Sequence, residues 1–221
     1  MEGITIRNAT IHDVPFLVDT IIEAEKSGTE TLSYTTIFGL SEIEARKYIA
    51  NMLLEEIDGC ELSISSFKIA VKDDQIAAAS AAWIEGLEGI PSNVLKGNLL
   101  NYSLPKECIE RAFSVNHLLS ELHINNISET MQLGLVYVSS GFRGLNLVGL
   151  LMEEQIVQLH KIKPNINAIY VQVFANNLSA INSYKKNNFE VILVKESYVK
   201  EISQYLPSNK KILMKKELFI K

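Results

Sequence analysis

The turn at Ser139–Asn146 is the stretch whose residue types are best suited to chemistry, because it opens directly into a helix. It contains Gly141 and Gly144, and from Leu147 onward apolar residues recur at helical spacing: Val148, Leu151, Met152, Ile156 and Leu159. The first backbone N–H groups of a helix have no internal partner and lie at the positive end of its dipole. The turn therefore predicts a site for an anion, above all for phosphate.

The residues before this turn predict the strand that positions it. Residues 131–138 alternate between two faces, and one face carries Met131, Leu133, Leu135 and Tyr137. A period of two is typical of a strand. A strand therefore leads into the turn, and the turn begins a helix that ends near Pro164.

Patterns elsewhere in the chain predict a mixed sheet. Strands are expected at 4–7, 67–71, 76–84, 169–173, 189–194 and 211–218, and helices after Asp13, after Ser41 and at 177–188. Asp13 is the expected N-cap of the first helix, residues 27–40 and 195–209 are expected loops, and residues 87–128 a helical insertion before the central strand. A hairpin requires antiparallel strands, whereas strands that alternate with helices require parallel ones. The predicted fold class is therefore α/β (α+β mixed), with a central twisted mixed β-sheet of about seven strands flanked by helices, in one domain covering residues 1–221.

Composition and charge argue against several classes of protein. Of the 221 residues, 47% are apolar and 21% are charged, so the chain can bury a sizeable core. The net charge of −5 argues against a general binder of nucleic acid or anionic membranes. Cys60 and Cys108 have no metal-like spacing, so we expect no metal and a reducing compartment. The N-terminus lacks the features of a signal peptide, and the run 76–84 is too short to span a membrane, so a cytoplasmic protein is expected.

Two local motifs resemble those of the GNAT N-acetyltransferase superfamily. In the first, Val138–Leu151, the family has Arg or Gln, two further residues, Gly, one residue, and then Gly or Ala; Arg143 takes the first place and Gly144 follows it. The second, Asn177–Phe189, reads N-x-x-A-I-x-x-Y-x-x-x-x-F and matches the family well. Each motif follows a predicted strand, and the strand order extends the resemblance over nearly the whole chain. The resemblance implies a GNAT-like sheet and acetyl-CoA as the acyl donor.

The chain departs from the family pattern at three positions. Asn146 and Val148 stand where the family has small residues, and Asn188 stands where it usually has Gly. Asn can adopt the positive φ that such turns require, so the turn should remain competent. Val148 lies one turn into the helix, where we expect it to face the sheet.

The resemblance implies how the donor would be bound. Backbone N–H groups from Arg143 to Val148 would hold the CoA pyrophosphate, and free backbone groups of Val136 and Val138 would pair with the pantetheine arm. A backbone N–H near Leu135 or Val136 would polarise the thioester carbonyl, and Asn177 would contact the pantetheine or cap the following helix. The implied cofactor-binding residues are Val136, Tyr137, Val138, Arg143, Gly144, Leu145, Asn146, Leu147, Val148, Gly149, Asn177 and Tyr184.

Catalysis by such a protein needs an acid and a base. The resemblance implies that Tyr184 gives a proton to the leaving thiolate; without it, Tyr184 would be a core aromatic residue. The acceptor amine must lose a proton, and a carboxylate acting directly or through water is the usual base. No motif fixes that base. Glu129, which enters the central strand, is the first candidate and Glu85 the second, and each can also be a solvated surface acid.

Two functions compete. The first is an N-acetyltransferase that moves an acetyl group from acetyl-CoA to a primary amine of a small molecule or peptide by direct attack, since no nucleophilic Cys or Ser motif calls for an acyl-enzyme. The second is a non-catalytic acyl-CoA-binding or regulatory module that retains the fold; Tyr184 favours the first. We expect no nucleic-acid or membrane partner and leave a homodimer open. A cationic acceptor is mildly favoured by Glu85, Glu88, Glu121 and Glu129.

Overall fold

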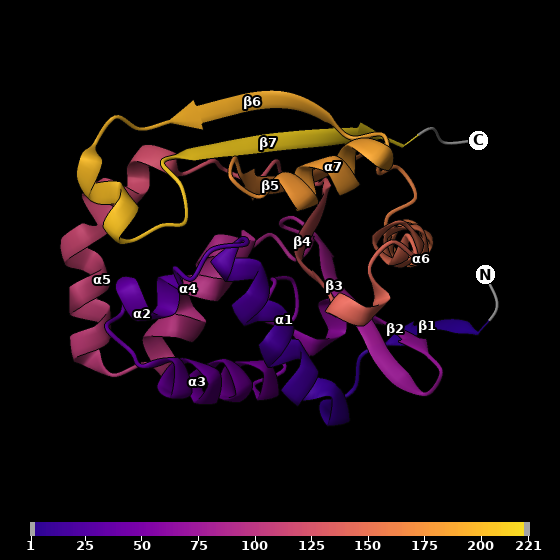
Figure 1. The fold of residues 1–221 in the computed structure, drawn as a ribbon, viewed down its shortest axis with the longest axis horizontal. Helices are drawn as coiled ribbons and strands as arrows, with labels where there is room; N and C mark the ends of the chain where they lie inside the picture. The colour runs from indigo at the N-terminus through magenta and orange to yellow at the C-terminus, as the bar shows by residue number, and fades with distance from the viewer. Residues whose placement is uncertain (1–2, 219–221) are drawn as a thin grey trace.

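Seven strands form one mixed sheet in the computed structural model, which describes residues 3–218 (Figure 1). The strands are β1 (Ile4–Asn8), β2 (Phe67–Lys72), β3 (Gln75–Ile84), β4 (Met131–Val138), β5 (Ala168–Phe174), β6 (Glu190–Glu196) and β7 (Lys210–Glu217). Their spatial order is β1-β2-β3-β4-β5-β7-β6, and the β4–β5 pair is parallel whereas the other neighbours are antiparallel. The predicted mixed sheet is confirmed.

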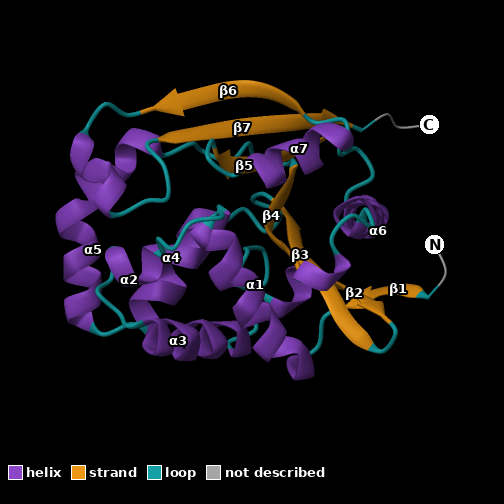
Figure 2. Cartoon of the chain, in the orientation of Figure 1, coloured by secondary structure: helices purple, strands orange, loops and turns teal. Residues whose placement is uncertain are grey.

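Helices cover both faces of this sheet (Figure 2). They are α1 (Val14–Lys26), α2 (Ser33–Thr36), α3 (Glu42–Leu54), α4 (Ser92–Ser103), α5 (Lys106–Leu119), α6 (Leu147–Ile162) and α7 (Leu178–Lys186). On β3, Ala79 and Ala81 pack into the cluster that contains α1 and α3. Ala78 contributes to a second cluster with Leu147 and Leu151 of α6. Burial on both faces explains why β3 is almost continuously apolar in sequence.

The helical insertion predicted before the central strand consists of α4 and α5. Pro91 and Pro105 are their respective N-caps, so each helix begins directly after a proline. In Figure 1 the two helices lie beside α2 and α3, away from α6. The insertion therefore extends the molecule on one side of β4. No helix among residues 3–218 has the length and apolar character needed to cross a bilayer.

Two sequence-based predictions about local structure were wrong. The expected loop at 27–40 contains the short helix α2, and the expected loop at 195–209 contains a 3-10 helix, Lys200–Gln204. Asp13 takes the predicted N-cap position of α1, but its side chain makes no hydrogen bond to the helix. Its carboxylate instead accepts hydrogen bonds from both terminal nitrogens of Arg7 and from the N–H and hydroxyl of Thr10. The side chain therefore fixes the connection from β1 rather than the start of the helix.

Candidate active site

Strands β4 and β5 separate after only three residue pairs, at Met131, Gln132 and Leu133. On its other side β4 stays paired with β3 as far as Val138. A register shift in that pairing and a positive φ of 45° at Leu135 mark a bulge in β4. The edge of β4 that faces β5 is therefore unpaired along its second half. Such an edge can accept an extended ligand as an added strand.

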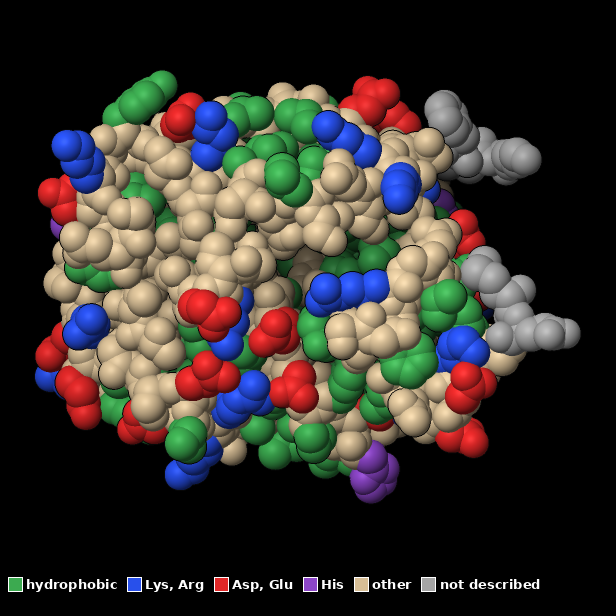
Figure 3. All heavy atoms as spheres, viewed as in Figure 1, with side chains coloured by type: hydrophobic (Ala, Val, Ile, Leu, Met, Phe, Trp, Pro, Cys, Tyr) green, Lys and Arg blue, Asp and Glu red, His purple; other side chains and the backbone are tan. Residues whose placement is uncertain are grey.

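A cavity of about 620 Å³ fills the gap between the two strands. Its walls include Leu135 and Val136 from β4, Val173 from β5, and Asn177 and Tyr184 at α7. The space-filling view shows a hollow near the middle of the face drawn, in the region of β4 (Figure 3). The volume is within the range that small-molecule sites in proteins usually have.

Tyr184 reaches the cavity from α7. The side chain of Asn177 begins this helix by accepting a hydrogen bond from the N–H of Ala180 at 3.1 Å, which is the capping role predicted for it. The Tyr184 ring lies 5.6 Å from the ring of Phe189, centroid to centroid, and the residue is 6% exposed. Burial raises the pKa of the Tyr184 phenol, so the hydroxyl is protonated at neutral pH.

The predicted anion turn directly follows the free end of β4. Asn146 adopts the left-handed conformation with φ of 55°, and Gly144 has φ of 86°. The Asn146 side chain makes no capping bond to α6, so it does not occupy the first N–H groups of the helix. The prediction that Asn146 can take a positive φ is confirmed, and the same holds for Asn188 with φ of 65°.

Gly149 allows the first turn of α6 to lie close to the end of α7. A Cβ at this position would be 2.6 Å from Oδ1 of Asn187 and 2.7 Å from the side-chain nitrogen of Asn146. The neighbouring Val148 packs against the apolar cluster of β4 and β5, as predicted. The first turn of α6 therefore packs directly against the end of α7.

Of the predicted site residues, those that line the cavity are Glu85, Leu135, Val136, Asn177 and Tyr184, whereas the others do not line it. The Tyr137 ring lies 6.1 Å from the ring of Phe16. The side chains that lie beyond the cavity lining are those of Tyr137, Val138, Arg143, Leu145, Asn146, Leu147 and Val148. These residues would therefore contact the donor mainly through their backbone groups, outside the cavity.

The two candidate bases lie in different places. Glu85 is 4% exposed and accepts hydrogen bonds from the indole of Trp83 at 3.1 Å, the N–H and hydroxyl of Ser92 at 2.8 and 2.6 Å, and the amide of Asn126 at 3.0 Å. Glu129 lies on the surface, where its carboxylate pairs with Lys163 at 2.7 Å and does not line the cavity. The Lys163 contact lowers the pKa of Glu129. The geometry therefore favours Glu85 over the first candidate.

Four charged residues in the cavity wall were missed by the sequence analysis: Glu25, Glu61, Lys96 and Lys211. They come from the last turn of α1, the segment before β2, α4 and the start of β7. Lys96 pairs with Glu61 at 2.8 Å. Burial opposes the charge of Lys96, but Glu61 and Glu25 outweigh it and raise the pKa of the ammonium. Each of these residues lies in a different element, so no sequence spacing could have indicated the cluster.

The same fold occurs in known acetyltransferase structures. An N-acetyltransferase from Staphylococcus aureus Mu50 superposes with a TM-score of 0.64 over 96% of this chain and 100% of that one, at 12% sequence identity. The chain has the GNAT N-acetyltransferase fold. A polyamine N-acetyltransferase of Drosophila melanogaster aligns over 97% of this chain and 100% of that one, with a TM-score of 0.58 and 14% identity. An acetyltransferase of the GNAT family from Streptococcus pneumoniae aligns over 98% of this chain and 99% of that one, with a TM-score of 0.51 and 15% sequence identity.

At these identities the likeness establishes the GNAT fold and leaves the activity to be argued from the site. No protein-family model matches the sequence, and no curated protein matches it either.

Proposed function

We propose that this chain is an N-acetyltransferase that moves an acetyl group from acetyl-CoA to a primary amine by direct attack. The observation that supports this most is the cavity between the separated strands β4 and β5, with the protonated Tyr184 in its wall. Carboxylates lie in the same wall. A non-catalytic acyl-CoA-binding module would need the cavity but not the acid.

The proposed reaction uses three groups of the chain. The amine nitrogen attacks the thioester carbonyl carbon, and a backbone N–H near Leu135 or Val136 stabilises the negative charge that forms on oxygen. The carbon–sulfur bond then breaks, and Tyr184 donates its proton to the departing thiolate. The proton lost by the amine passes through water to Glu85. The proposed reaction uses no metal, and the proposal keeps the cytoplasmic location expected from the sequence.

Donor binding is tested first. Calorimetry should show that acetyl-CoA binds the full chain, and Gly149→Ala should weaken this binding because the new methyl group would displace the side chains of Asn146 and Asn187. Gly97→Ala is the matched control, since a Cβ there meets nothing within 4 Å. If acetyl-CoA failed to bind the unaltered protein, both the enzyme and the module would be excluded.

Replacing Glu85 tests the base. Glu85→Gln should lower kcat by about 10- to 100-fold at neutral pH. The deficit should shrink at higher pH, where more of the acceptor amine is already deprotonated. Ser92→Ala is the control, because it removes one hydrogen bond from Glu85 but keeps the carboxylate. Equal losses of activity in both variants would mean that Glu85 only supports the structure.

A homodimer is a further part of the proposal, and it would form through strand β6. Strand β6 lies at the edge of the sheet and exposes four successive apolar side chains, Val191, Ile192, Leu193 and Val194. Such an edge is suited to pairing with a second copy. Light scattering that gives the mass of one chain would contradict it.

A further inference from the structure

A second cavity, of about 530 Å³, adjoins the one described above. The two share the wall residues Glu25, Lys96, His123, Phe174 and Lys211. Beyond this shared wall the second cavity is mostly apolar, and its lining comes from α2, α4, α5 and the segment before β7: Ile37, Phe38, Leu100, Phe113, Leu119 and Leu206. The helical insertion thus forms a space suited to an apolar group.

The charges in the shared wall are not all neutralised within the protein. Lys96 is paired with Glu61. Among the described residues, Glu25 accepts a hydrogen bond from the Ser33 hydroxyl but forms no ion pair. Lys211 likewise has no carboxylate partner there, and its ammonium nitrogen lies 5.7 Å from the centre of the Phe174 ring. Within the described part of the chain, Glu25 and Lys211 therefore have no close ion-pair partner at the junction of the two cavities, while the charge of Glu25 acts on both Lys96 and Lys211.

The charged form of Lys211 is destabilised by its surroundings, and a neighbouring anion would stabilise it. Burial, and then the positive charge of Lys96, lowers the pKa of Lys211 to about 8. The ammonium is therefore still present at neutral pH, although its surroundings disfavour it. An anionic group placed beside Lys211 would favour the charged form.

Tyr34 supplies a second, independent indication of a ligand. The residue is 2% exposed and lines the apolar cavity, and its hydroxyl is buried with no hydrogen-bond partner among the described residues. Tyr34 lines the second cavity together with Glu25 and Lys96 of the shared wall. A buried hydroxyl without a partner is costly, so an acceptor atom supplied by a ligand would stabilise it.

We propose that the acceptor is an α-amino acid with an apolar side chain. Its ammonium group would pair with Glu25, its carboxylate would pair with Lys211 and accept a hydrogen bond from Tyr34, and its side chain would occupy the second cavity. The amine would then face the first cavity, where the acetyl donor is bound in the proposed function on which this inference rests. Before attack the ammonium would lose one proton through water to Glu85, and the products would be the N-acetyl amino acid and free CoA, whose thiolate takes the proton of Tyr184.

The test compares acceptors that differ in one group, in a thiol-release assay with fixed acetyl-CoA. L-phenylalanine and L-leucine should be used with kcat/KM at least about tenfold above that of phenethylamine, which lacks the carboxylate, or glycine, which lacks the side chain. Tenfold corresponds to about 1.4 kcal/mol, a modest value for one charge-assisted contact. Agmatine and a peptide with a free N-terminus complete the panel. Preference for any of these over L-phenylalanine would overturn the inference.

Single substitutions test which residues cause the preference for an amino acid over an amine. Lys211→Gln should raise KM for L-phenylalanine about tenfold and leave phenethylamine unchanged, because only the amino acid has a carboxylate. Lys215→Gln is the matched control, since Lys215 lies on the same strand, 5.7 Å from the centre of the Tyr170 ring, but outside both cavities. Equal effects of Lys211→Gln on both acceptors would contradict the assignment.

Tyr34→Phe gives a readout that a purely structural role would not produce. It should leave the ligand-free protein equally or more stable, because it removes a buried hydroxyl without a partner, yet raise KM for L-phenylalanine. An unchanged KM would remove Tyr34 from the site. Thiol release with phenethylamine or agmatine alone would overturn only the amino-acid inference, whereas no release with any amine would also overturn the proposed enzyme.

Discussion

Tyr184→Phe should lower kcat by about 10²- to 10⁴-fold, the range over which general acid catalysis usually contributes. The buried phenol keeps its proton and lines the cavity, and the substitution removes only the group that would protonate the thiolate. Affinity for acetyl-CoA should change little, because the ring and its contact with Phe189 remain. Steady-state thiol release and calorimetry with acetyl-CoA measure the two quantities separately.

The control for this variant is Tyr170→Phe. Tyr170 is also a buried tyrosine, 7% exposed, but it lies on β5 outside the cavity lining. Its replacement should leave kcat unchanged. A Tyr184→Phe protein that retained full turnover would show that another group, or water, protonates the thiolate.

Asp13→Asn should destabilise the protein by about 2 kcal/mol at neutral pH. The hydrogen bonds from Arg7, opposed by burial and assisted by Thr10, lower the pKa of Asp13 from its ordinary value of 3.8 to about 2. A depressed pKa means that the ionised form stabilises the folded state at pH values above about 4. This contribution is lost as the pH falls from about 4 to about 2. Urea unfolding of both proteins across this range should show their difference in stability shrinking with acid.

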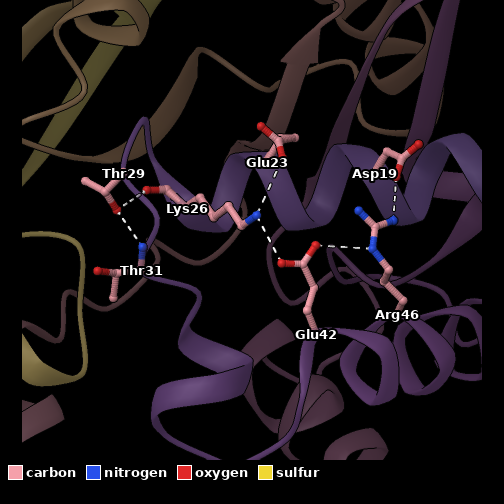
Figure 4. Close-up of polar contacts among 7 residues, drawn as sticks. All are labelled: Asp19, Glu23, Lys26, Thr29, Thr31, Glu42 and Arg46. Carbon is pink, nitrogen blue, oxygen red and sulfur yellow. Dashed lines mark hydrogen bonds and ion pairs between the residues drawn. The ribbon is translucent and has the colours of Figure 1, made fainter.

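Asp19→Asn is the matched control for that experiment. Asp19 pairs with Arg46 at 2.6 Å in the surface network that joins α1 to α3 (Figure 4). Arg46 also contacts Glu42, which in turn pairs with Lys26. The Asp19 side chain is 49% exposed, so its loss should cost less than about 1 kcal/mol. Equal losses from the two substitutions would mean that the buried position of Asp13 adds nothing.

The parts of the fold that could be predicted are those in which local pattern and tertiary environment agree. Residues 131–138 form β4 with the predicted bounds, and α6 begins at Leu147, because the alternating and helical patterns there also face the core. Asp13 takes the predicted N-cap position of α1, but its carboxylate bonds to Arg7 and Thr10 instead of capping the helix. Nothing in the local sequence indicates that competition.

Only the site residues that lie within a recognisable sequence motif could be predicted. Tyr184 and Asn177 lie within one short segment, so their spacing was informative, and both line the cavity. Glu129 was chosen for its place at the entry to β4, but its side chain is on the surface with Lys163. Glu25, Lys96 and Lys211 are far apart in sequence and meet only because α1, α4 and β7 converge. Such a cluster depends on packing between elements and has no sequence period.

The short pairing between β4 and β5 also affects how the molecule holds together. β1–β4 and β5–β7 form two half-sheets joined at this seam by three residue pairs at one end. A donor that bonded along the open edge would contact both half-sheets and so stabilise their association. The free energy of unfolding would then depend on the donor concentration, and it would rise by about 2.7 kcal/mol when that concentration is a hundred times Kd. The abundance of the folded protein in a cell would in that case report the state of its acyl-donor pool.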